Sequence, residues 1–128
     1  MTDTATTSPA QLVAGYFNCW NTTDAVARQH AIAAVWAPDA RSVDPIADVT
    51  GHEELAAMFA GFHDTYPGHS FRAVGDTDTH HNLARWGWEM VAPDGTTALN
   101  GIDCALLDSN GRIIYLAGFF GIDLPTGS

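Results

Sequence analysis

The stretch TTALNGIDCALLDSNGRIIYLAGFFG, residues 96–121, decides the fold class of this chain. Two runs rich in strand-forming residues, 96–107 and 112–121, flank the turn cluster DSNG, which is typical of an antiparallel strand pair. Both sides of the first run are largely apolar, because one side carries Ile102, Cys104 and Leu106 and the other carries Leu99, Gly101, Asp103 and Ala105. The sheet that contains this pair must therefore be covered on both faces.

Two further strands are predicted upstream, at residues 69–75 and 83–92, and the second ends at the turn cluster Pro93-Asp94-Gly95. Four strands that follow one another through short turns predict an antiparallel meander. A short extended stretch at 40–44 stands apart from them and ends at Pro45.

Helical patterns precede the meander. Ser8, Pro9 and Gln11 form a helix start, and the apolar spacing after them predicts a helix to about residue 20. Asp24 can cap a second helix that ends before Pro38. Thr50 and Glu53 form a capping-box pattern for a third helix, which ends at Tyr66-Pro67-Gly68 and has one apolar face of Leu55, Met58, Phe59 and Phe62.

This order of elements predicts an α+β fold in which three N-terminal helices pack on one face of a curved antiparallel sheet. A length of 128 residues suits a single domain over 1–128, with an ordered core from about 8 to 122. We expect a second copy of the chain to cover the open sheet face, on which Ile102, Cys104 and Leu106 lie.

The composition and charge of the chain exclude some classes of binding partner. The net charge is -10, and the five cations are all arginines that form no basic run, so we expect neither nucleic acid nor a membrane surface as partner. Residues 1–7 carry no signal-peptide pattern and no apolar run reaches spanning length, so the cytoplasm is the expected location. Cys19 and Cys104 lie in a helical and a strand pattern, which indicates apolar fillers rather than a disulfide.

Three residues stand out as candidates for acid/base chemistry. Asp103 lies among apolar strand residues, so we expect it to be buried, with a raised pKa that keeps it protonated. Asp44 precedes Pro45 and is either a turn aspartate or a functional carboxylate. Tyr16 places a phenol on an apolar helix face, where a structural core tyrosine is the commoner interpretation.

The segments WAPDARSVDP at 36–45, GID at 101–103 with GFFG at 118–121, and LVAGY at 12–16 resemble the ketosteroid isomerases and SnoaL-like polyketide cyclases of the nuclear transport factor 2-like superfamily. The resemblance implies a cone-shaped, cystatin-like roll, here a single SnoaL-like domain. It also implies that Asp44 is the general base and that Tyr16 and a protonated Asp103 stabilise an enolate oxygen. The details DPIADVTGH at 44–52 and WGWE at 86–89 look closer to the SnoaL-like branch.

The residues expected to contact a hydrophobic substrate are Met58, Phe59, Phe62, Trp88, Leu116, Gly118 and Phe120. The resemblance favours this role for Leu116, Gly118 and Phe120, whereas Trp88, which shares one side of a strand with Trp86 and Met90, either lines the pocket or fills the core. Phe59 takes the place of a tyrosine that supports the phenol in the isomerases, so Tyr16 is expected to lack that hydrogen bond.

The sequence thus predicts an enzyme that moves a proton next to a carbonyl in a hydrophobic small molecule, as an isomerase or an aldol-type cyclase. No cofactor and no metal are expected, because the histidines lack ligand spacing. A non-catalytic small-ligand or interaction module, favoured by Phe59, and an epoxide hydrolase that activates water with a carboxylate are the alternatives.

Overall fold

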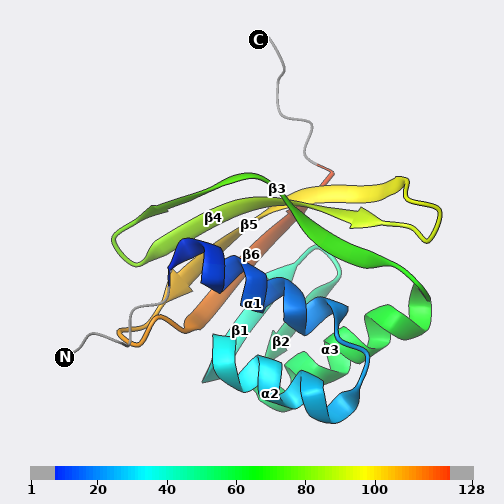
Figure 1. Cartoon of the computed structure of the whole chain (residues 1–128). Coiled ribbons are helices and arrows are strands. Elements are labelled where there is room, and N and C mark those ends of the chain that lie inside the picture. Colours follow the sequence, from blue (N-terminus) through cyan, green and yellow to red (C-terminus); the bar gives the residue numbers. More distant parts are fainter. Residues whose placement is uncertain (1–7, 122–128) are drawn as a thin grey trace, which may run out of the picture.

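The computed structural model describes residues 8–121, and the polar tails predicted at 1–7 and 125–128 lie outside this range. Within it the chain forms three helices and six strands (Figure 1). In chain order these are α1 (Pro9–Asn21), α2 (Ala25–Val35), β1 (Trp36–Asp44), β2 (Ala47–Thr50), α3 (His52–Thr65), β3 (Ser70–His80), β4 (Leu83–Val91), β5 (Thr97–Leu107) and β6 (Ile113–Phe120). The predicted α+β class is confirmed.

The six strands form one sheet in the order β2-β1-β6-β5-β4-β3. The four strands β3 to β6 are the predicted antiparallel meander, and β2 forms an antiparallel hairpin with β1. The sheet is mixed rather than wholly antiparallel, because β1 lies parallel to β6. A parallel pair needs a long crossover connection, which α3 and the meander supply here.

The helices gather on one side of the bent sheet, with α1 running across it (Figure 1). α1 begins as predicted: Ser8 Oγ accepts a hydrogen bond from the N–H of Gln11, and Gln11 Oε1 accepts one from the N–H of Ser8. Asp24 caps α2 by accepting a hydrogen bond from the N–H of Ala27. These caps satisfy amide groups that the helices leave free, and so they set where each helix starts.

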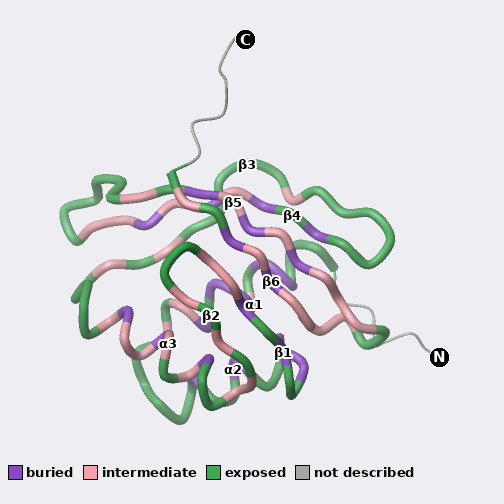
Figure 2. Tube along the Cα trace, turned by 180° about the vertical axis from the view of Figure 1, so that it is seen from behind, coloured by how far each residue is buried: buried purple, intermediate pink, exposed green. Residues whose placement is uncertain are grey.

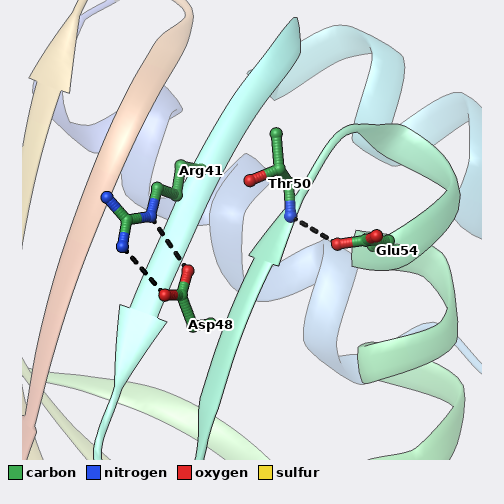
Figure 3. Close-up of polar contacts among 4 residues, drawn as sticks. All are labelled: Arg41, Asp48, Thr50 and Glu54. Atoms are coloured by element: carbon green, nitrogen blue, oxygen red, sulfur yellow. Dashed lines mark hydrogen bonds and ion pairs between the residues drawn. The ribbon is translucent and has the colours of Figure 1, made fainter.

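The predicted capping box of α3 is wrong. Thr50 belongs to β2, where it is paired with Arg41, and the cap residue is Gly51 at a φ of 88° with no side-chain capping bond. Glu54 rather than Glu53 reaches back, and its Oε1 accepts a hydrogen bond of 2.7 Å from the N–H of Thr50 (Figure 3). A glycine is needed at this turn because a positive φ strains other residues.

The first strand also differs from the prediction. It starts at Trp36 and runs through Pro38, whereas a short stretch from residue 40 was expected. Pro38 is tolerated because the pairing of β1 with β6 is interrupted between Trp36 and Arg41, so no ladder hydrogen bond is lost there. The short strand β2 was not predicted, and β3 extends five residues beyond its predicted end at Gly75.

The core lies between the helices and the inner face of the sheet, where buried positions alternate along β4, β5 and β6 (Figure 2). Its most completely buried side chains are Trp36, Trp86, Phe59, Ile32, Leu55, Ile113 and Cys19. Cys104 lies half-buried on the outer face, and both cysteines are free. None of the helices within residues 8–121 is long and apolar enough to cross a membrane.

Candidate functional site

An apolar cavity of about 540 Å³ lies between the inner face of the sheet and the helices α1 and α3. This volume is within the range of sites that hold small organic ligands. Aromatic side chains make up much of its wall, including Phe17, Trp20, Phe62, Phe71, Trp88 and Phe120. The three residues predicted to carry chemistry, Tyr16, Asp44 and Asp103, also line it, although they come from α1, β1 and β5.

Asp103 is the buried carboxyl of the cavity, with 5% of its surface exposed. It lies in the middle of β5, directly opposite Trp86 on β4 and Gly118 on β6. Residues of β5 point alternately to the two faces of the sheet. Ile102 and Cys104, on either side of Asp103, face outward, so Asp103 faces the core. The expectation from sequence that this carboxyl is buried therefore holds in the structure.

Burial raises the pKa of Asp103 to about 7, because a desolvated carboxylate is less stable than the neutral acid. Tyr16, Trp88 and Trp86 oppose this increase by offering N–H and O–H donors that stabilise the charged form, while the negative charge of Asp44 adds to it. The pKa that results is far above that of an ordinary carboxyl, so the neutral acid is accessible at much higher pH than for an exposed aspartate.

Tyr16 is 2% exposed, and the rings of Phe17, Trp36 and Trp86 pack around it with centroids 4.9 to 5.9 Å away. Burial and the neighbouring Asp103 hold the pKa of its phenol well above the usual range. The phenol is therefore neutral across the ordinary pH range and can donate a hydrogen bond.

Trp20 lies one helical turn after Tyr16 and was not predicted as a site residue. Its indole acts on the phenol and lowers the pKa of Tyr16, although burial outweighs this effect. The Trp20 ring also packs edge-on against Phe59, with centroids 4.7 Å apart. The sequence signal was available, because Tyr16 and Trp20 are spaced i, i+4 on the apolar face of α1.

Asp44 stands at the end of β1 and is partly exposed at the cavity. Its Oδ1 accepts a hydrogen bond of 2.9 Å from the N–H of Ile46, which is the turn role that the sequence suggested. The other carboxyl oxygen makes no protein hydrogen bond within residues 8–121. The turn and the cavity roles are thus compatible.

Gly118 on β6 separates the two aspartates. A Cβ atom at this position would lie 2.9 Å from Asp103 Oδ1 and 3.3 Å from Asp44 Cβ. The absence of a side chain therefore lets both carboxyl groups share one end of the cavity.

Among the residues predicted to bind substrate, five line the cavity: Met58, Phe62, Trp88, Leu116 and Phe120. Two take other places. Phe59 is fully buried behind the wall, in contact with Trp20, and Gly118 lies beneath the two aspartates. The wall also includes Phe71 and Leu99, whose strands were predicted but whose facing depends on how the sheet bends.

The residues that could hold a metal or an anionic cofactor do not gather at this cavity. None of its described lining residues is a histidine, cysteine, lysine or arginine. Across residues 8–121 no group of three histidine, cysteine or acidic side chains is close enough to hold a metal ion.

The fold and the cavity define a class: α+β proteins in which helices and a bent sheet enclose an apolar pocket with buried acid groups. The family model of the SnoaL-like domain matches residues 13–116. The chain belongs to the SnoaL-like domain family, as its sequence resemblance suggested. A comparison with curated proteins gave no significant match.

Solved structures agree with this assignment. A candidate isomerase of the SnoaL-like family from Agrobacterium tumefaciens is 32% identical, with a TM-score of 0.84 over 88% of this chain and 97% of that one. A candidate polyketide cyclase from Sinorhizobium meliloti is 17% identical, with a TM-score of 0.66 over 84% and 92% of the two chains. A cystatin-like protein of unknown function from Nostoc punctiforme is 18% identical, with a TM-score of 0.69 over 91% and 90%. The last two show the fold alone, and the cystatin-like roll is confirmed.

Proposed function

We propose that this protein is an acid/base enzyme that removes a proton from the carbon next to a carbonyl in a hydrophobic small molecule. The observation that carries the proposal is the meeting of Tyr16, Asp44 and Asp103 in one apolar cavity, although they lie far apart in the sequence. The two outcomes of such chemistry are isomerisation and aldol-type cyclisation, as in the polyketide cyclases.

Asp44 is the base in this proposal. Because its Oδ1 is held by the Ile46 N–H, the second oxygen is free to take a proton from a ligand in the cavity. Tyr16 and the acid form of Asp103 are the donors for the oxygen on which negative charge develops. Donors that are already in place and shielded from water stabilise such a charge strongly, and the loss of one costs about 100- to 1000-fold in rate.

The ligand is expected to be uncharged. Two carboxyl groups line the cavity, and its described lining residues include no cationic side chain that could balance an anion. Burying an unpaired negative charge beside these carboxyl groups would be unfavourable. Neutral ketones therefore suit the cavity better than carboxylic or phosphorylated compounds.

The test is deuterium uptake from heavy water by a panel of hydrophobic ketones, read by mass spectrometry. Asp44→Asn should bind the same ketones, but the rate of deuterium exchange should fall at least about 100-fold, because an amide does not accept the proton at neutral pH. Asp39→Asn is a matched control, since Asp39 lies exposed on the same strand and outside the cavity.

Exchange that continues unchanged in Asp44→Asn would exclude Asp44 as the base. If ketones bind to the wild-type protein but none exchanges, the non-catalytic ligand-binding module becomes the better description. Conversion of an epoxide to a diol without ketone exchange would favour the hydrolase.

We also propose that the protein forms a homodimer through the outer sheet face. This face carries Ile102, Cys104 and Leu106 on β5, and their cross-strand partners on β6 include Tyr115 and the 53% exposed Phe119. The arginines of the face are paired within the chain, as Arg41–Asp48 (Figure 3), Arg72–Glu89 and Arg85–Asp78. Each pair is locally neutral, so the charges of these pairs add little repulsion where two such faces meet.

A further inference from the structure

Two tryptophans beside the cavity have indole N–H groups that are buried without a hydrogen-bond partner among the described residues. These are Nε1 of Trp86 and Nε1 of Trp88, both on β4. An indole nitrogen can only donate a hydrogen bond, and a buried donor without an acceptor destabilises a fold because it has lost its bond to water. Such groups therefore call for an acceptor close by.

The sheet register places both indoles beside one acceptor. Trp86 is directly opposite Asp103 across the β4–β5 pair, and Trp88 is opposite Gly101, two residues before Asp103 on the same inner face. Cross-strand and diagonal neighbours on one face lie within reach of large side chains. Asp103 is thus the carboxyl that both tryptophans can approach.

Gly101 shows how the Trp88 ring is oriented. A Cβ atom on Gly101 would lie 2.4 Å from Cζ2 and 2.7 Å from Cε2 of Trp88. Cε2 is bonded to the indole nitrogen, so the part of the ring that carries the nitrogen lies close to Gly101, two residues before Asp103 on the same face of β5. The missing side chain at Gly101 makes room for this close approach.

We propose that Trp86 and Trp88 are positioning residues, whose indole N–H groups hold the Asp103 carboxyl so that its acid proton faces the cavity. A carboxylic acid has one carbonyl oxygen that accepts and one O–H that donates. If the indoles donate to the first oxygen, the O–H remains for a ligand. The inference deepens the proposed function, on which it rests for the use of that proton.

The electrostatics of the site agree with this arrangement. Both tryptophans lower the pKa of Asp103, against the burial and the Asp44 charge that raise it. Tyr16 from α1 and Asp44 from β1 are the other ionisable side chains that act on this carboxyl, and Cys104, next in the strand, faces outward. Without the indoles, burial would shift the carboxyl further toward its neutral form.

The first test uses the unmodified protein and needs no substrate. Its four tryptophans give four indole signals in a ¹H–¹⁵N NMR spectrum. The signals of Trp86 and Trp88 should shift with pH around a midpoint of about 7, and this shift should disappear in Asp103→Asn. Trp36 is the internal control. Its N–H is also buried without a hydrogen-bond partner, but it affects the pKa of Cys19 and not that of Asp103. Indole signals of Trp86 and Trp88 that stay constant through the Asp103 titration would overturn the proposal.

The second test replaces single indoles and follows the Asp103 carboxyl by ¹³C NMR. Trp86→Phe and Trp88→Phe should each raise the pKa of Asp103 by about one unit, the usual effect of losing a hydrogen bond to a charged group. Trp36→Phe is the matched control and should leave it unchanged. An equal rise in all three variants, or none in the first two, would refute the positioning role.

These readouts separate the inference from the proposed function. A protein that exchanges no ketone can still show coupled indole and carboxyl titrations, which would leave the positioning role intact and remove only its catalytic use. If a core substitution prevents folding, the wild-type spectra decide the question.

Discussion

Replacement of Asp103 by asparagine should make the stability of the protein less sensitive to pH. The pKa of this carboxyl is 3.8 in a model peptide and rises to about 7 in the fold, a difference of about three units. Between these values the folded chain binds a proton that the unfolded chain has released, so stability falls as pH increases through this window. At 1.36 kcal/mol per unit the loss amounts to about 4 kcal/mol and is complete about one unit above the folded pKa.

The assay is urea unfolding of the wild type and Asp103→Asn at several pH values from 4 to 9. The stability of the wild type relative to the variant, in which asparagine does not titrate, should fall by about 4 kcal/mol between pH 4 and about pH 8. It should then stay level, because Asp103 is ionised in both the folded and the unfolded chain. Asp39→Asn, which changes an exposed carboxyl, should follow the wild type. A difference between wild type and Asp103→Asn that is the same at pH 5 and pH 8 would refute the reasoning.

Further predictions concern the cavity and the outer face. Gly118→Ala should slow proton exchange about 10- to 100-fold with little loss of ketone binding, because its Cβ would displace the Asp103 carboxyl; an unchanged rate would show that the two aspartates need not share this space. Tyr16→Phe should slow exchange about 100-fold, measured by the same deuterium assay, through the loss of one donor. A neutral ketone should bind at least about 10-fold more tightly than its carboxylic analogue by calorimetry, with the reverse order counting against an acid-lined apolar cavity. Light scattering should give the mass of a dimer for the wild type and of a monomer for Leu106→Glu, and a monomeric wild type would contradict the proposed interface.

Secondary structure was predictable from the sequence where the interactions that set it join residues within one short segment. The caps at Ser8 and Asp24 are correct because the capping atoms lie within three residues of the groups they satisfy. The cap of α3 was predicted wrongly because Thr50 is held in β2 by its pairing with β1, a contact that no local pattern reveals. Tertiary pairing overrode local propensity at that point.

The site was partly predictable for the same reason. A carboxylate surrounded by apolar strand residues has to be buried, so Asp103 stood out from its neighbours alone. The sequence did not identify the roles of Trp20, Trp86 and Phe59, because an aromatic residue on an apolar face is as common in a protein core as in a binding site. Their effect on Tyr16 and Asp103 depends on ring orientation.

The sequence by itself determined the three helices, the four strands of the meander and the burial of Asp103, since capping, alternation and turn residues act over a few positions. Only the tertiary structure decided that β1 lies parallel to β6, and hence that Asp44 and Asp103 meet across Gly118. It alone also decided that the Trp88 ring lies over Gly101. Such contacts join residues far apart in the chain, and their geometry follows from how the whole sheet bends and packs, which no short-range pattern specifies.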